Sequence, residues 1–350
     1  MQSVMSSSTL VPNARQRGTR SVATELVIQD SVIAFPFHWQ VPAATEKAAY
    51  ESVCTAPKPL GFEYIAFPWA TLIDGLRGDA ACIGLLLMAL RNINELPRKA
   101  TRRVTVAQHI HAMQFVELFK CCGITDVFWP HATHQQLTIE GIALHPFPLF
   151  PAQTPDVAPP NEIKGPCKYL ANFIGAYNPG LYLTNVRQVI FDDPNEAGDL
   201  LIIRREAWHF DRAVYEEQIK GIPVEDQKLL SERRQAEEYL AAIKDSWFTL
   251  CPTGSGPNSI RIYEALALGC IPIILTKTLR LSVRLALWEK ATLIEEDSAA
   301  GYLRVISRAR AMSNVERQRM IVAGAELYAY VGPASYARLI GANFRIMEEA

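Results

Sequence analysis

Residues 251–275 read CPTGSGPNSIRIYEALALGCIPIIL, and this stretch decides the fold. An apolar run leads into a loop that contains Gly254 and Gly256, an amphipathic segment follows, and Gly269 separates it from a second apolar run. This order predicts a strand, a glycine loop, a helix over 259–268 and a strand over 271–275. Such a unit is typical of a parallel sheet flanked by helices.

The loop and the start of the predicted helix are suited to binding an anion. Gly254 and Gly256 allow the backbone to come close to a ligand. Asn258 or Ser259 is placed to cap the helix, whose free N–H groups attract a phosphate. Arg261 falls in the first helical turn, where its planar fork of donors fits a diphosphate better than a lysine does.

Glu264 extends this anion site along the same helix face. It follows Arg261 by three positions, which places it about 4.5 Å further along the helix axis. The separation predicts that the Glu264 carboxylate holds ribose hydroxyls while the diphosphate lies at the helix start.

Two other kinds of glycine loop fit this segment poorly. A P-loop needs a lysine followed by serine or threonine after its last glycine, and none stands here. A dinucleotide fold needs an acidic residue after the next strand, where this chain has Thr276 and Lys277.

The rest of the chain predicts two α/β domains. Short apolar runs alternate with helical patterns before a proline-dense stretch at 146–160, and the alternation resumes after it. Because 350 residues exceed what one core fills, two domains are expected. The predicted division is a disordered tail at 1–22, an acceptor-side domain at 23–150, a linker at 151–165, a nucleotide-sugar-binding domain at 166–330 and a C-terminal helix at 331–350.

The composition argues against nucleic-acid-binding, zinc-binding, membrane-spanning and secreted proteins. The 35 basic and 36 acidic residues nearly cancel, which argues against nucleic acid as a partner. Seven scattered cysteines lack zinc-ligand spacing and predict reduced thiols. The most apolar run, at 83–90, is shorter than the ~20 residues of a membrane span, and the N-terminus has no secretory pattern. A cytoplasmic enzyme is expected, with peripheral contact at the inner membrane face left open.

The 251–275 segment resembles the exostosin family, whose pattern is approximately Cys-Pro-Arg-Gly-x-Gly-x-x-Ser-x-Arg-x-x-Glu-Ala-Leu-x-x-Gly-Cys-Ile-Pro-Val-Ile. From Gly254 onward every position matches, apart from isoleucine for valine near the end. Thr253 departs from the pattern, since the family usually has arginine there. The resemblance continues loosely through the second domain and is faint in the first.

The resemblance implies two facing Rossmann-like domains of the glycosyltransferase B fold, with the active site in the cleft between them. It implies sugar transfer from a nucleotide donor that binds mainly to the second domain, and Gly256, Ser259, Arg261 and Glu264 carry over as donor contacts. No cofactor is expected beyond the donor itself. A UDP-sugar is the expected donor, and a CMP-sugar stays open. The expected acceptor is a saccharide, free or lipid-linked, in bacterial surface-polysaccharide synthesis.

Further donor contacts are candidates at the ends of predicted strands. Arg204 and Arg205 end the run at 200–204, at the sheet edge where α/β proteins bind ligands. They are candidates for the donor phosphates, and a solvated charge pair is the alternative. Gly175, at the end of the run at 169–175, would let a phosphate approach or simply form a turn.

The first domain is expected to supply a base that takes the proton of the acceptor hydroxyl. Asp74 ranks first and His131 second, since both follow apolar runs that read as strands, and His38 is a third candidate. A helix cap or a buried structural histidine would explain the same residues. Trp39, Trp69 and Trp129 are expected in the core, with stacking on an acceptor sugar as the alternative.

Metal-independent catalysis is expected, because the resemblance implies the glycosyltransferase B architecture, in which a helix start and arginines usually replace the metal. His109 with His111, and His131 with His134, lack an acidic or cysteine ligand at suitable spacing, and a helix face explains them better. Two alternatives to a transferase remain: a catalytically silent sugar-nucleotide-binding or scaffolding subunit, and a hydrolase or epimerase of nucleotide sugars. The sugar, the linkage and the stereochemical outcome stay open.

Overall fold

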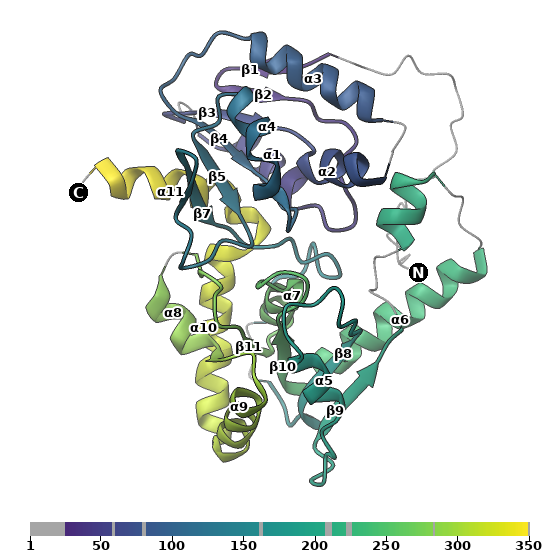
Figure 1. Cartoon of the computed structure of the whole chain (residues 1–350). Helices are drawn as coiled ribbons and strands as arrows, with labels where there is room; N and C mark the ends of the chain where they lie inside the picture. Colours follow the sequence, from purple (N-terminus) through teal and green to yellow (C-terminus); the bar gives the residue numbers. More distant parts are fainter. Residues whose placement is uncertain are drawn as a thin grey trace, which may run out of the picture.

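The computed structural model describes residues 25–57, 60–78, 82–160, 164–206, 212–221, 226–282 and 284–348. The tail expected at 1–22 therefore lies outside the described residues. Two sheets, each with its own helices, form the body of the molecule (Figure 1). The expected pair of α/β domains with mostly parallel sheets is confirmed.

The first sheet has the strand order β1-β2-β3-β4-β5-β7-β6. Its middle strands pair in parallel, and an antiparallel hairpin closes each edge. The strands are β1 (Val27–Gln29), β2 (Val32–Ala34), β3 (Glu63–Ala66), β4 (Arg103–Val106), β5 (Asp126–Trp129), β6 (Thr138–Ile139) and β7 (Ile142–Pro146). Residues of β3, β4 and β5 are buried throughout, as expected for strands covered on both faces.

The second sheet is wholly parallel, in the order β12-β11-β10-β8-β9. Its strands are β8 (Tyr169–Gly175), β9 (Leu200–Arg204), β10 (Ser246–Pro252), β11 (Ile271–Leu275) and β12 (Leu293–Glu295). Every residue of β10 and β11 is buried, which explains why the two runs that flank the glycine loop are continuously apolar.

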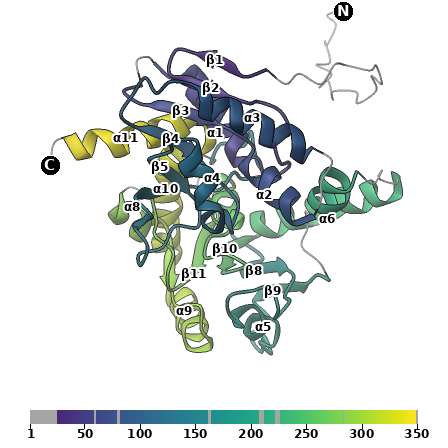
Figure 2. The ribbon, with the colours of Figure 1, turned by 45° about the horizontal axis from the view of Figure 1, so that its top comes forward.

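Helices cover the faces of both sheets (Figures 1 and 2). Those of the first domain are α1 (Thr45–Thr55), α2 (Trp69–Gly78), α3 (Ile83–Glu95), the 3-10 helix η1 (Ala112–Phe115) and α4 (Val116–Cys121). The second domain has α5 (Val186–Phe191), the π-helix η2 (Arg212–Ile219), α6 (Asp226–Lys244), α7 (Ile260–Ala267), α8 (Leu285–Ala291), α9 (Ala299–Ala311) and α10 (Asn314–Val331). The 3-10 helix η3 (Pro333–Ser335) leads into α11 (Tyr336–Glu348).

The last described helix, α11, packs against the first domain. Tyr336, Leu339 and Ile340 of α11 pack in one buried cluster with Val104 and Phe128 of the first sheet. In Figure 1 the yellow α11 accordingly lies beside β5 and β7, while α10 runs through the second domain. The C-terminal helix therefore joins the two domains.

Several predicted segments match the observed elements, and one is wrong. The strands predicted at 169–175, 200–204 and 271–275 have those bounds. The run around Asp74 is a helix, because residues 69–78 form α2; Asp74 therefore lies within a helix and not at a strand end. An apolar run of this length fits a buried helix as well as a strand.

The domains meet through the segments that follow β5 and β11. The Ala132 carbonyl accepts a hydrogen bond of 2.9 Å from the Arg280 backbone N–H, and His134 N–H donates to the Thr278 carbonyl at 3.1 Å. These bonds fix the residues after β5, including His131, against the second domain.

Candidate active site

The glycine loop lies between the carboxyl ends of β10 and β11. Thr253 N–H donates to the Leu275 carbonyl at 3.1 Å, and Gly254 N–H donates to the Gly256 carbonyl at 3.0 Å. The helix after the loop begins at Ile260 and ends before Gly269, whose φ of +63° is left-handed. The strand, loop, helix and glycine stop are thus arranged as the sequence predicts.

Asn258 and Ser259 lie at the start of α7 but have different partners. Asn258 is buried; its Nδ2 donates to the Pro130 carbonyl of the first domain at 2.9 Å, and its Oδ1 accepts from Ser259 N–H at 2.8 Å. Asn258 thus ties the loop to the opposite domain. Ser259 is the N-cap residue, and its side chain makes no capping bond, so the hydroxyl stays available to a ligand.

Arg261 reaches from α7 to the end of β8. Its Nη2 donates to the Ile174 carbonyl at 2.7 Å, and its guanidinium lies 5.0 Å from the centre of the Phe173 ring. A β-carbon on Gly175 would stand 2.6 Å from Nη2, so this approach needs glycine there. Nε of Arg261 is buried and has no hydrogen-bond partner in the described part of the chain.

Glu264 is 3% exposed and already accepts two hydrogen bonds. Its Oε1 accepts from Gln153 N–H at 2.9 Å, and its Oε2 accepts from the Tyr239 hydroxyl at 2.6 Å. Burial raises the pKa of this carboxyl, and both bonds oppose the rise. Each oxygen keeps a second lone pair that can accept a further hydrogen bond.

Arg204 and Arg205 have partners of their own. The Arg204 guanidinium lies 5.2 Å from the centre of the Phe191 ring, and Arg205 forms an ion pair with Glu238 of α6. Only the Arg205 backbone touches the site, through a 2.7 Å bond from its N–H to the Gly175 carbonyl. Their role at the donor phosphates therefore remains a prediction.

Arg187 is the residue of this site that the sequence did not reveal. It projects from α5 beneath the loop, and a β-carbon on Gly254 would stand 3.1 Å from its Nη2. A lone arginine on a short helix far from the loop carries no local motif. The one sequence feature that could have indicated such a residue is the threonine at position 253, where the exostosin pattern has arginine.

His131 faces the glycine loop from the first domain. It is 6% exposed, and a β-carbon on Gly256 would overlap its Nδ1. The Gln108 backbone beside the ring favours the protonated form of His131. Nδ1 is buried without a partner among the described residues. Burial is the largest effect and, with a smaller one from His109, lowers the pKa of His131 to about 3, so the ring is neutral.

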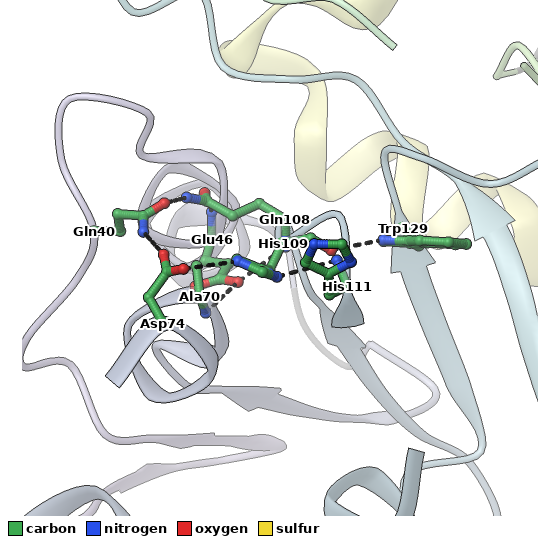
Figure 3. A network of polar contacts seen from close by, with 8 residues as sticks. All are labelled: Gln40, Glu46, Ala70, Asp74, Gln108, His109, His111 and Trp129. Carbon is green, nitrogen blue, oxygen red and sulfur yellow. Dashed lines mark hydrogen bonds and ion pairs between the residues drawn. The ribbon is translucent and has the colours of Figure 1, made fainter. Parts of the chain in front are cut away.

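Asp74 belongs to a buried polar network behind this histidine (Figure 3). Its Oδ1 lies 3.0 Å from His109 Nε2, and its Oδ2 accepts from Gln40 Nε2 at 2.7 Å. His109 Nδ1 accepts from His111 N–H at 3.1 Å, which makes Nε2 the protonated nitrogen. Both Asp74 oxygens are thus engaged, and Asp74 holds His109 in place.

Gln108 connects that network to His131. Its backbone N–H donates to Glu46 Oε1 at 2.9 Å, and its backbone favours the protonated form of His131. Glu46 also accepts from Ala70 N–H at the start of α2 (Figure 3), and burial raises its pKa to about 8. The polar network therefore fixes the backbone that lies beside the His131 ring.

The remaining aromatic and histidine candidates lie mainly in the core. Trp69 and Trp129 are buried and donate their indole N–H to Thr105 and to the His109 carbonyl. Trp39 is partly buried and stacks on Tyr50, and His38 is exposed.

The metal candidates fall in a turn rather than on the expected helix face. His109 and His111 lie between β4 and η1, outside any helix, so that expectation is wrong. In the ranges that the structure describes, no group of three or more histidine, cysteine, aspartate or glutamate side chains is placed to hold a metal ion. The same ranges contain no helix long and apolar enough to cross a bilayer.

Comparison with known proteins finds one family. Residues 132–300 match the family model of the Exostosin GT47 domain. Over 56 residues the chain is 39% identical to the probable glucuronoxylan glucuronosyltransferase IRX7 of Arabidopsis thaliana. That match covers 16% of this chain and only 12% of the plant protein.

Solved structures give weak likenesses over most of the chain. The α,α-trehalose 6-phosphate synthase of Burkholderia multivorans aligns with a TM-score of 0.40 and 11% identity, over 87% of this chain and 82% of that one. The sucrose-phosphate synthase of Thermosynechococcus elongatus aligns with a TM-score of 0.41 and 12% identity, over 83% and 74%. At these values the likenesses bear on neither substrate nor mechanism.

Proposed function

We propose that the chain is an exostosin-like glycosyltransferase, whose residues 132–300 match the Exostosin GT47 domain, and that it moves a sugar from a UDP-sugar to a hydroxyl of a saccharide. The observation that carries the proposal is the position of His131, whose buried, unpartnered Nδ1 faces Gly256 of the glycine loop. A base from one domain thus stands opposite the anion-binding loop of the other.

The donor side of the cleft would hold the nucleotide. Arg261 and the free N–H groups at the start of α7 bind the diphosphate, with Gly175, Gly254 and Gly256 permitting close approach. Glu264 accepts hydrogen bonds from the ribose with the lone pairs that Gln153 and Tyr239 leave free.

The acceptor side would supply the base. The acceptor hydroxyl gives its proton to His131 Nδ1 while its oxygen attacks the anomeric carbon, and the bond from that carbon to the phosphate oxygen breaks. The leaving diphosphate takes the electron pair, and its charge is stabilised by Arg261 and the helix start. The donor's negative charge also raises the low pKa of His131, which makes it a stronger base. Because His131 is buried against Gly256, the domains must separate to admit substrates.

We propose that this chemistry needs no metal and no cofactor beyond the donor. Protein cations and helix N–H groups are in place to stabilise the departing charge. A soluble or lipid-linked saccharide at the cytoplasmic face of a membrane remains the expected acceptor. The bacterial setting has no support in the comparisons, since the curated relative is a plant protein.

A thermal-shift panel tests the donor site. UDP, UDP-sugars, CMP and GDP are added to the wild type, to Arg261→Gln and to the control Arg91→Gln, an exposed arginine of α3. We expect at least one nucleotide to raise the melting temperature of the wild type and of the control, but not of Arg261→Gln. No shift in folded wild type would contradict the proposal and favour a scaffold.

A further inference from the structure

Arg187 is a buried arginine that, among the residues the structure describes, is bonded only to neutral groups. It is 6% exposed on α5; its Nε donates to the Thr253 carbonyl at 2.8 Å, and its Nη1 donates to the Ala176 carbonyl at 3.0 Å. The guanidinium lies 4.4 Å from the centre of the Tyr182 ring. Two of its nitrogens are thus fixed by backbone, and Nη2 is directed toward Gly254.

Arg187 and Arg261 are close enough to repel each other. The centre of the Phe173 ring lies 5.7 Å from the Arg187 guanidinium and 5.0 Å from that of Arg261. Burial, and after it the Arg261 charge, lowers the pKa of Arg187 to about 9, which still leaves it protonated at neutral pH. Neither arginine has a carboxylate partner among the described residues.

Two neighbouring cations, Arg187 buried and Arg261 partly buried, have no counter-ion among the described residues, which is costly unless a ligand supplies the opposite charge. Their carbonyl partners hold them in place and do not neutralise them. Among the described residues, Nη2 of Arg187 lies 3.1 Å from where a β-carbon on Gly254 would stand, and Nε of Arg261 has no hydrogen-bond partner. Each of these nitrogens can donate a hydrogen bond to a ligand.

We propose that Arg187 is a second phosphate-binding residue, which acts with Arg261 on the two phosphates of the donor. This inference rests on the proposed function. It also explains how the loop can lack the arginine that the exostosin pattern has at position 253. Arg187 on α5 places its guanidinium beside the loop and takes the place of that arginine. Thr253 instead donates its hydroxyl to Asp297 at 3.0 Å.

The role of Arg187 can be measured by comparing ligands that carry different numbers of phosphate charges. The diphosphate of a sugar nucleotide carries two negative charges, whereas a sugar linked through one phosphate carries one. If Arg187 binds the second phosphate, it strengthens binding of a nucleoside diphosphate more than of a monophosphate. A purely structural role for Arg187 would alter both affinities equally.

The test is the ratio of diphosphate to monophosphate affinity. UDP, UMP, GDP and GMP are titrated calorimetrically into the wild type, Arg187→Gln and Arg187→Lys. The control is Arg317→Gln, which removes an arginine that likewise stacks on aromatic rings and donates to a backbone carbonyl. Arg317 lies over Trp247 and Phe248, at the opposite end of β10 from the loop.

We expect wild type and Arg317→Gln to bind a diphosphate more tightly than its monophosphate, and Arg187→Gln to reduce that ratio roughly 10- to 100-fold. Arg187→Lys should reduce it less, because one ammonium cannot hold two carbonyls and a phosphate together. If Arg187→Gln does not fold, an unchanged ratio in Arg187→Lys overturns the inference.

Other outcomes separate the inference from the proposed function. An unchanged ratio in folded Arg187→Gln, or equal losses for diphosphate and monophosphate, would overturn the role of Arg187 and leave the donor site standing. Folded wild type that binds none of the four nucleotides would overturn the donor site, and the role of Arg187 with it.

Discussion

The Nδ1 atom of His131 occupies the space that a β-carbon on Gly256 would need, so the two domains touch at the glycine loop. This contact joins a residue after β5 to the glycine loop after β10.

Gly256→Ala is expected to destabilise the contact between the two domains. The added methyl would overlap the buried His131 ring. We expect a loss of about 1–3 kcal/mol in the free energy of unfolding and roughly tenfold slower transfer. In a His131→Ala background the stability loss should be much smaller, because the ring is gone and only the close approach to Ile110 Cγ2, at 3.1 Å, remains. Gly84→Ala is the control, since a β-carbon there meets nothing within 4 Å.

His131 should make stability depend on pH. Its pKa is lowered from 6.5 to about 3 in the folded chain, so the unfolded chain binds the additional proton between those values. The contribution of the neutral His131 ring to the free energy of unfolding is therefore fully present above pH 6.5. It is lost as the pH falls, with a slope that approaches about 1.4 kcal/mol per pH unit. Urea unfolding at pH 5, 6 and 7 should show a shallower dependence in His131→Gln than in the wild type. The same slope in both would contradict a neutral buried ring; exposed His134→Gln is the control.

Asp74→Asn separates a positioning role from a catalytic one. The new amide must place a donor against Gln40 or His109, both of which already donate to Asp74. We expect a cost of about 1–3 kcal/mol in chemical unfolding, with the turnover of the folded fraction changed only a few-fold. If Asp74→Asn lowered turnover as much as His131→Gln does, Asp74 would be the better candidate for the base. Asp156→Asn, at an exposed position, should change neither quantity.

Tyr239→Phe should make nucleotide binding more sensitive to pH. The tyrosine hydroxyl bonds Glu264 and counteracts the rise that burial causes in the pKa of that carboxyl. Without it the pKa rises further, so Glu264 is protonated at a higher pH and accepts fewer bonds from the ribose. We expect the fall in nucleotide affinity on acidification to begin at higher pH than in the wild type. An unchanged profile, as expected for Tyr330→Phe, would argue against ribose binding by Glu264.

The second domain was predictable because its elements are local in sequence. The strands at 169–175 and 271–275 are apolar runs bounded by glycine or polar residues, and the loop between β10 and α7 contains its glycines, arginine and glutamate within a few positions. A buried parallel strand needs no partner to be recognised.

The first domain and the surroundings of the site depend on contacts between distant residues. Asp74 lies in an apolar run that fits a strand as well as a helix. Its carboxylate makes hydrogen bonds with Gln40 and His109, which lie far from it in the sequence. Glu264 meets Gln153 and Tyr239, and Arg187 meets Thr253, across long intervals of sequence. No spacing rule within one segment predicts such partners.

The most direct test of the central claim is acceptor-dependent release of nucleoside diphosphate by the full chain. A panel of sugar nucleotides is combined with saccharide acceptors, and release is measured with wild type, His131→Gln and His134→Gln. We expect release that rises with acceptor in the wild type and in His134→Gln, and that falls roughly 10²–10⁴-fold in His131→Gln. Release independent of acceptor would indicate a hydrolase or epimerase, and nucleotide binding without release would indicate a silent subunit; either result would contradict the account.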